Sequence, residues 1–194
     1  MLYLILIILS IIIGLLRGGE LEKLYHISIK GTYLFAVALL LRGMIWLFGR
    51  MGFHQIYEYS PFIIIVSYIL FIIASFQNIN FSGFRYITLG VLMNSFVIFV
   101  NGGKMPVLVT QQVSEEISGK VLFGQGQNIV YSLADNKTFF TFLGDVLTLP
   151  KLLQCSSIVS VGDIMIFIGI FILIQKTMLK EEFLSDSLKD ILNE

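Results

Sequence analysis

Five long apolar runs, separated by short polar connections, dominate the chain. They cover residues 2–16, 31–49, 60–76, 86–100 and 157–175. The hydrocarbon core of a bilayer is about 30 Å thick, and roughly 20 apolar residues cross it as a helix. Each run approaches that length, and the first reaches it with snorkelling or local thinning of the bilayer. The pattern predicts an all-α membrane protein, a bundle of about five transmembrane helices.

The first run has a second interpretation, a cleaved signal peptide. Such a peptide carries a positive region before its apolar core and a site of small residues after it. Here LYLILIILSIIIGLL has no preceding basic residue, and Arg17, two glycines and Glu20 follow it directly. We therefore expect the first run to be a retained membrane helix.

Composition supports a lipid environment and narrows the choice of partners. Of 194 residues, 56% are hydrophobic and 13% are charged, whereas a soluble domain has about 25% charged residues. Thirteen Lys and Arg balance thirteen Asp and Glu, so the chain lacks the basic surface that nucleic-acid binding requires. One cysteine and two histidines are too few for a zinc site. We expect the lipid bilayer as partner, and no metal and no cofactor.

The distribution of basic residues predicts the orientation in the membrane. Connections 17–30 and 77–85, together with the tail 176–194, carry seven Lys and Arg. Connection 50–59 carries only Arg50, and the long segment 101–156 carries four, which count less in a long loop. We expect a single membrane domain at the cell membrane, with its N-terminus outside and its C-terminus cytoplasmic.

The tail and the long segment each have a predicted role. Apolar residues recur at helical spacing in the tail, which favours a helix on the membrane surface or on a membrane or cytoplasmic protein partner, with a solvated tail as the alternative.

The segment 101–156 is extracytoplasmic in this topology and too apolar for a linker. We expect it to fold over the outer mouth of the bundle, with 121–123 and 129–131 pairing as strands. Residues 138–153 then either dip into the interface or lie on top.

Two charged residues and one asparagine lie inside the spans. Arg42, Asn94 and Asp163 are six or seven residues from the ends of their runs, about 9–10 Å at 1.5 Å per residue. Counting membrane crossings puts all three on one side at nearly one depth. An unpaired charge there costs roughly 2.5–3.5 kcal/mol even on a lenient scale. We therefore predict an Arg42–Asp163 ion pair with Asn94 in its network, either at a functional site or as a device that fixes helix register.

Two further polar elements lie at the same mouth. The sequence NGGKMP, from Asn101 to Lys104 and beyond, predicts a sharp turn with glycines at positive φ and a proline that stops the helix. Asp145 comes shortly before the last span. Asp145 and Asp163 could form an aspartyl dyad, or they could be unrelated acids. Because a cation is the better partner for a carboxylate, we expect Asp163 to contact Arg42 and not Asp145.

Three glycines inside the runs are expected at close contacts between helices. Glycine lets two helix backbones approach each other, which is how many membrane helices associate. The positions are Gly14, Gly43 and Gly90.

The order of four motifs resembles an uncharacterised bacterial family of small multi-pass membrane proteins, a domain of unknown function. These motifs are LLRGG after the first run, NGGKMPV after the fourth, LGDVLTLP, and SVGDIMIFIGIFILI. The resemblance covers nearly the whole chain. It implies a shared architecture and a membrane location, and it supplies no reaction. The chain departs from the expected pattern at Arg42, where a glutamine-like residue would stand.

A fainter likeness runs to the lipoprotein signal peptidases, aspartyl enzymes of the bacterial membrane. The sequence from Ser160 to Asp163 is similar to the N-x-A-D-like motif that opens their last span. Their second motif, G-N-x-x-D-R-like, has no counterpart here, and four spans are expected there against five here. The likeness would imply hydrolysis by Asp145 and Asp163.

These observations favour a multi-pass membrane protein of unassigned activity with a polar, ligand-sized site at its outer mouth. A membrane-embedded aspartyl hydrolase is the second hypothesis. A small transporter, with Arg42 and Asp163 as gating charges, is the third, although no inverted repeat is visible. The binding site of the first hypothesis is lined by Arg42, Asn94, Asn101, Lys104, Asp145 and Asp163.

Overall fold

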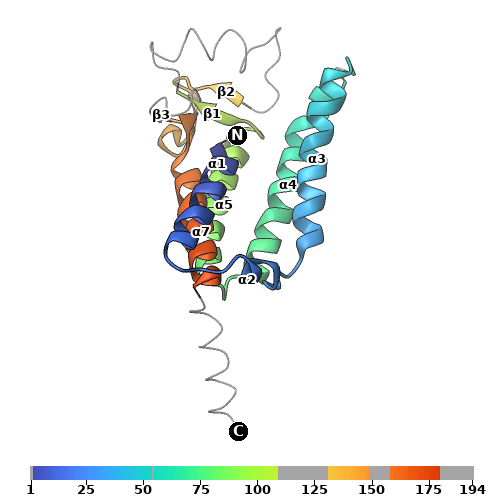
Figure 1. The fold of residues 1–194 in the computed structure, drawn as a ribbon. Coiled ribbons are helices and arrows are strands. Elements are labelled where there is room, and N and C mark those ends of the chain that lie inside the picture. The colour runs from blue at the N-terminus through green and yellow to red at the C-terminus, as the bar shows by residue number, and fades with distance from the viewer. Residues whose placement is uncertain (1, 54, 109–130, 149–157, 180–194) are drawn as a thin grey trace.

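Helices form most of the structure that is described (Figure 1). The structure is a computed structural model and describes residues 2–53, 55–108, 131–148 and 158–179. In chain order, the helices are α1 (Leu2–Leu16), α2 (Glu22–Tyr25), α3 (Thr32–Arg50), α4 (Ile56–Gln77), α5 (Ser82–Val100) and α7 (Val161–Met178).

Within the described residues, four helices, α3, α4, α5 and α7, are long and apolar enough to cross a membrane. The fifth apolar helix, α1, has 15 residues and spans about 22 Å at 1.5 Å per residue. The predicted fold class is confirmed, because the chain is an all-α membrane protein with little sheet. The lipid bilayer is therefore the environment of these helices.

Helix ends differ from the predicted runs where polar residues extend or cap a helix. α4 begins at Ile56 and not at residue 60, because interfacial polar and aromatic residues continue the helix beyond its apolar part. α5 likewise begins at Ser82 and not at residue 86. α7 begins four residues later than predicted, because Ser160 caps it and Ile158–Val159 form a strand.

α5 and α7 pack closely through paired glycines. A Cβ atom on Gly90 would collide with the carbonyl oxygen of Gly162, and one on Gly83 would collide with that of Gly169. Backbone therefore meets backbone at two levels of this interface. The close contact predicted for Gly90 is confirmed. The one predicted for Gly43 is wrong, because a Cβ there would meet nothing within 4 Å.

α1 is joined to α7 by polar contacts at the end of the bundle opposite the N-terminus. The Arg17 guanidinium donates to the Gln175 side-chain oxygen at 2.9 Å, and the Gln175 amide donates to the Ser10 carbonyl at 2.7 Å. Gly14 lies directly against the Met178 side chain, as its predicted role requires. These contacts keep α1 beside α7.

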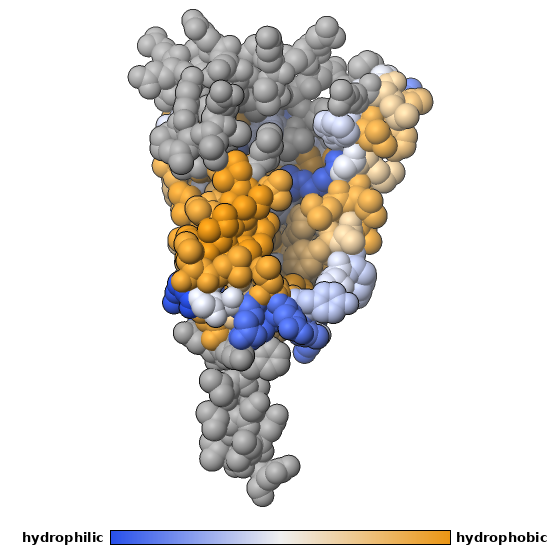
Figure 2. Space-filling view, viewed as in Figure 1, coloured by the Kyte–Doolittle hydropathy of each residue, from blue (hydrophilic) through white to orange (hydrophobic). Residues whose placement is uncertain are grey.

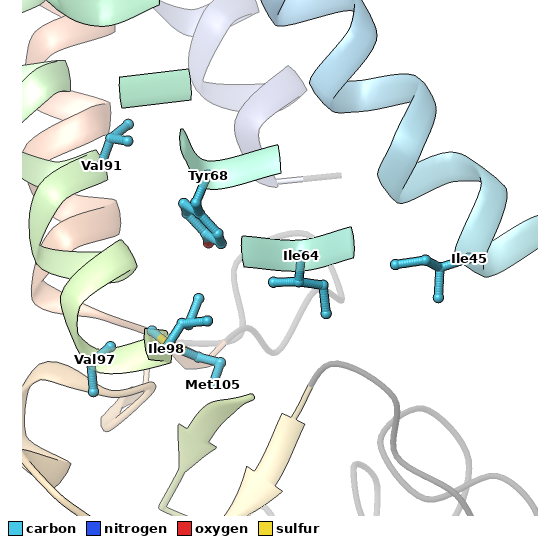
Figure 3. Packing of buried hydrophobic residues seen from close by; sticks show 7 residues of the cluster. All are labelled: Ile45, Ile64, Tyr68, Val91, Val97, Ile98 and Met105. Carbon is cyan, nitrogen blue, oxygen red and sulfur yellow. The ribbon is translucent and has the colours of Figure 1, made fainter. Parts of the chain in front are cut away.

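The buried apolar core lies between α3, α4 and α5. α3 packs on α4, and α4 packs on α5. The core includes Ile45 of α3 and Ile64 and Tyr68 of α4, with partners from α5 and the segment after it (Figure 3). Where such side chains are removed from water, burial stabilises the fold by about 25 cal/mol per Å² of apolar surface. Where the helices lie in the bilayer, there is no water to exclude, and close van der Waals packing stabilises the core instead.

A small non-helical layer lies across the end of α5, at the same end as the N-terminus (Figure 1). β1 (Met105–Val107) pairs in parallel with β2 (Tyr131–Leu133), and β3 (Leu147–Thr148) pairs antiparallel with β4 (Ile158–Val159). A 3₁₀ turn, η2 (Thr141–Leu143), lies between them.

The strand pairing predicted around 121–131 lies outside the described residues, apart from Tyr131. That residue pairs with Met105 of β1. Of the stretch 138–153, the described part runs through η2 and β3, and Leu143 packs against the buried core. This part of the chain therefore covers the end of the bundle.

Candidate functional site

Asp163 lies in the first turn of α7 and caps that helix. The Ser160 hydroxyl accepts a 2.9 Å hydrogen bond from the Asp163 backbone N–H. The Asp163 carboxylate accepts a 3.1 Å hydrogen bond from the Ser160 backbone N–H. This reciprocal arrangement is a capping box, which satisfies two N–H groups that a helix start leaves free. The prediction that Asp163 lies 9–10 Å inside the helix is therefore wrong.

Two other elements complete the hydrogen bonding of the Asp163 carboxylate. The Tyr3 hydroxyl of α1 donates to it at 2.8 Å, and the Asn94 amide of α5 donates to it at 2.9 Å. The Ser160 hydroxyl in turn donates to the Asn94 side-chain oxygen at 2.8 Å. Because Asn94 is buried, its amide needs such partners. One polar network thus ties α1, α5 and the start of α7 together.

Arg42 is not paired with Asp163, contrary to the prediction. No salt bridge joins these two side chains, and the Arg42 guanidinium carbon instead lies 5.0 Å from the centre of the Tyr68 ring. The reason is architectural. α3 packs on α4, while Asp163 belongs to α7 and already has three donors. A cation over an aromatic face gains about 0.5–2 kcal/mol, but it acquires no counter-charge.

Asp145 is held at the same end of the bundle by its backbone. Its N–H donates to the Pro106 carbonyl at 2.8 Å, and its carbonyl accepts from the Leu108 N–H at 3.0 Å. The residue is 8% exposed, and its carboxyl makes no hydrogen bond to Asp163 or to other described residues. Burial, with a smaller contribution from the Asp163 charge, raises the pKa of the Asp145 carboxyl to about 7.

The turn after α5 forms as predicted, with Gly102 and Gly103 at φ of 68° and 84°. Gly103 packs on Pro61 of α4, where a side chain would not fit. Residues 131–148, the covering segment, lie over the end of α5, and Asn101 holds them in place. Its side-chain amide donates to the Phe139 carbonyl at 2.9 Å, and its side-chain oxygen accepts from the Phe139 N–H at 3.0 Å. Lys104 is half-buried and makes no salt bridge with the described residues.

Three tyrosines, Tyr3, Tyr68 and Tyr131, and the capping role of Ser160 were not predicted at this mouth. Tyr68 is close enough to Arg42, Asp145 and Asp163 for each charge to act on its hydroxyl. Counting membrane crossings could have found Tyr3, because the start of the first span must lie on the same side as Arg42. The serine two residues before a glycine and three before an acid is a capping-box signal. Tyr131 reaches the mouth only through the pairing of β1 and β2, which no local pattern reveals.

The molecular surface shows how these polar groups relate to the apolar bundle. In Figure 2 the surface is hollowed between α1 on one side and α3 and α4 on the other. Hydrophilic residues lie in the part of the hollow nearest the covering segment, and apolar residues surround them. The polar mouth is therefore open toward the side of the bundle.

Long apolar helices with a polar cluster at one end define a multi-pass membrane protein. The chain belongs to DUF5317, a family of unknown function, whose model matches residues 26–175. An uncharacterized protein of Thermotoga maritima is 27% identical over 170 residues, which cover 88% of this chain and 86% of that protein. No solved structure matches the chain. The predicted membership of an uncharacterised family is confirmed.

Proposed function

We propose that this protein binds a small molecule with an anionic group at the outer mouth of its helix bundle. The observation that carries the proposal is Arg42, a cation in an apolar helix with no salt-bridge partner among the described residues. The acid of the expected network, Asp163, has its carboxylate engaged by Tyr3, Asn94 and Ser160.

The position of Arg42 inside α3 has a free-energy cost that a bound anion would offset. Arg42 is eight residues from the end of α3, about 12 Å along the helix axis. A charge at this depth is costly, and charged residues inside membrane spans mark ligand or ion sites. A guanidinium presents five N–H donors in a planar fork that matches a carboxylate or phosphate. A bound anion would supply the counter-charge that the fold does not.

The other polar residues have supporting roles in this proposal. Lys104 lies at the same mouth without a salt bridge and would add a second positive charge. Asn94 and Asp163 would fix the helices around the ligand, and Asn101 would hold the covering segment in position. The network therefore builds the site while Arg42 recognises the anion.

The test is the binding of simple anions to the purified full chain. Millimolar butyrate or inorganic phosphate should raise the thermal unfolding midpoint of the wild type in detergent, since a ligand that binds only the folded state stabilises it. Arg42→Gln should abolish the rise. Arg85→Gln, an exposed arginine on α5, is the matched control and should keep it. An equal rise in Arg42→Gln and wild type would overturn the proposal.

The orientation is part of the same proposal, with this mouth and the N-terminus outside and the C-terminus cytoplasmic. Its support is the set of basic residues at the opposite end, where Arg17, Lys23 and Lys176 contact the ends of α7 and α5. In a Cys155→Ser background, Lys137→Cys should react with an impermeant maleimide in intact cells. Glu22→Cys should react only after permeabilisation. The reverse pattern would invert the topology.

A second candidate, a membrane-embedded aspartyl hydrolase, is favoured by the properties of Asp145. This buried carboxyl has a pKa raised to about 7, and it feels the charge of Asp163, whose carboxylate is held by three donors. Two acids in such different environments are suited to act as acid and base. The purified chain should then cleave a fluorogenic membrane-anchored peptide, and Asp145→Asn should abolish cleavage. Cleavage unaffected by this substitution would exclude the dyad.

A further inference from the structure

The polar mouth opens sideways because two pairs of packed helices diverge around it. α1 packs on α7, whereas α3 packs on α4, and the connection between these groups runs through α4 and α5. The hollow in Figure 2 lies where α1 and α3 are not packed together, and Figure 1 shows the two groups spreading toward the covered end. In a bilayer this opening faces lipid.

A cluster of aromatic rings joins α3, α4 and α5 on the far side of Arg42 from the mouth. The ring of Phe35 on α3 lies 6.0 Å from that of Phe71 on α4 and 6.3 Å from that of Phe84 on α5, measured between ring centres. Phe35 precedes Arg42 by seven residues, about 10 Å along the helix. Arg42 thus lies nearer the polar mouth, and Phe35 lies about two helical turns farther from it along α3.

The covered end of the bundle argues against a ligand that is fully water-soluble. Asn101 binds Phe139 through two hydrogen bonds, and the Phe140 ring contacts that of Phe96 on α5 with ring centres 4.9 Å apart. These contacts hold the segment across the end of α5. Both α1 and α3 expose apolar side chains, with Leu4, Ile8, Leu39 and Trp46 among them.

We infer that the ligand is a membrane amphiphile with an anionic head and a long hydrocarbon tail, which enters from the bilayer between α1 and α3. This inference rests on the proposed anion site at Arg42. The head would meet the guanidinium at the polar end, and the tail would extend along the apolar opening toward Phe35. Charge complementarity at one end and apolar surface along the rest select this class of ligand.

The natural reporter for a test is Trp46, the chain's single tryptophan. It follows Arg42 by four residues, so both lie on the same face of α3, one turn apart. The probe is cis-parinaric acid, a fluorescent long-chain carboxylate that accepts energy from tryptophan. Full-length protein in detergent should show saturable energy transfer from Trp46 to the probe. The methyl ester of the probe, which has no charge, should bind at least tenfold more weakly.

Variants and competitors separate this inference from the proposed function. Arg42→Gln should weaken probe binding at least tenfold, Arg42→Lys should retain part of it, and Arg85→Gln should change nothing. A long-chain fatty acid should displace the probe at concentrations at least a hundredfold lower than butyrate does. Retained binding in Arg42→Lys would show that position 42 can be changed without unfolding the protein.

Three results would overturn the inference. Equal displacement by butyrate and the long-chain acid would leave the anion site standing and remove the tail. Probe binding that is the same in Arg42→Gln and wild type, together with no effect of butyrate or phosphate on unfolding, would remove both proposals. A stable dimer whose α1–α3 opening is protected without probe would identify a second copy of the chain as the occupant.

Discussion

Asn94 of α5 donates a 2.9 Å hydrogen bond to the carboxylate of Asp163 in α7. This contact joins the two most closely packed helices of the bundle at the polar mouth, beside the glycine pair Gly90 and Gly162. It gives the Asp163 carboxylate a neutral partner from the fold itself. The consequence is that Arg42, on the other side of the opening, has no salt-bridge partner in the part of the chain that the structure describes.

The Asp163 network predicts which residues are energetically coupled. Asp163→Ala should destabilise the protein by about 1–3 kcal/mol, because it removes half of the capping box and leaves the Asn94 side-chain N–H without its acceptor. In a double-mutant cycle, Asn94→Ala and Asp163→Ala should show a coupling of about 1 kcal/mol. The cycle between Arg42→Gln and Asp163→Ala is the control and should show almost none. A larger coupling for that second pair would restore the direct ion pair.

The two hydrogen bonds between Asn101 and Phe139 predict a specific loosening. Asn101→Ala should cost about 1–3 kcal/mol and free the segment 131–148 from the end of α5. Limited proteolysis of the folded protein should then cut in this segment several times faster than in wild type. Asn136→Ala, at an exposed turn of the same segment, should leave the rate unchanged. Unchanged cleavage in Asn101→Ala would show that other contacts hold the segment.

The glycine pair at the α5–α7 interface predicts a strong steric effect. Gly90→Ala should lower stability by about 1–3 kcal/mol, because the new Cβ would collide with the Gly162 backbone and force the helices apart. Gly43→Ala is the matched control, since a Cβ there meets nothing within 4 Å and alanine is the better helix former. Thermal unfolding in detergent measures both. Equal midpoints for the two variants would contradict this packing.

The raised pKa of Asp145 predicts a pH dependence with a definite sign. The unfolded carboxyl ionises near pH 4 and the folded one near pH 7, so the wild type loses stability as the pH rises from 4 to 7. At 1.36 kcal/mol per pKa unit, the full loss above pH 7 is about 4 kcal/mol. Asp145→Asn should flatten this dependence and unfold at a higher temperature than wild type at pH 8.

Asp135 provides the control for that experiment. Its carboxyl is exposed, and the hydrogen bond from the Thr138 hydroxyl lowers its pKa from 3.8. The pH dependence that Asp135 contributes therefore falls below pH 4, and Asp135→Asn should leave the slope between pH 4 and 7 unchanged. A wild-type unfolding midpoint that stays constant from pH 4 to 7 would show that Asp145 ionises normally in the folded protein.

Much of the architecture was already decided by local sequence. Runs of about 15–20 apolar residues must be helical in a bilayer, because every backbone hydrogen bond has to be made within the segment. All five predicted helices are present, and the glycine turn after α5 has the expected backbone. Counting membrane crossings also predicted that Arg42, Asn94 and Asp163 share one end, since crossing number depends only on order along the chain.

Only the tertiary structure decided which of these groups touch. Several polar groups lie at the mouth with Asp163, and which of them it contacts depends on helix packing. The glycines of α5 and α7 bring Asn94 against Asp163, while α3 packs on α4 and carries Arg42 to Tyr68. Tyr131 lies at the mouth because β2 pairs with β1, which is more than 20 residues away along the chain. Order along the chain determines the side of the membrane, whereas contacts across the bundle depend on close packing that no single run of sequence contains.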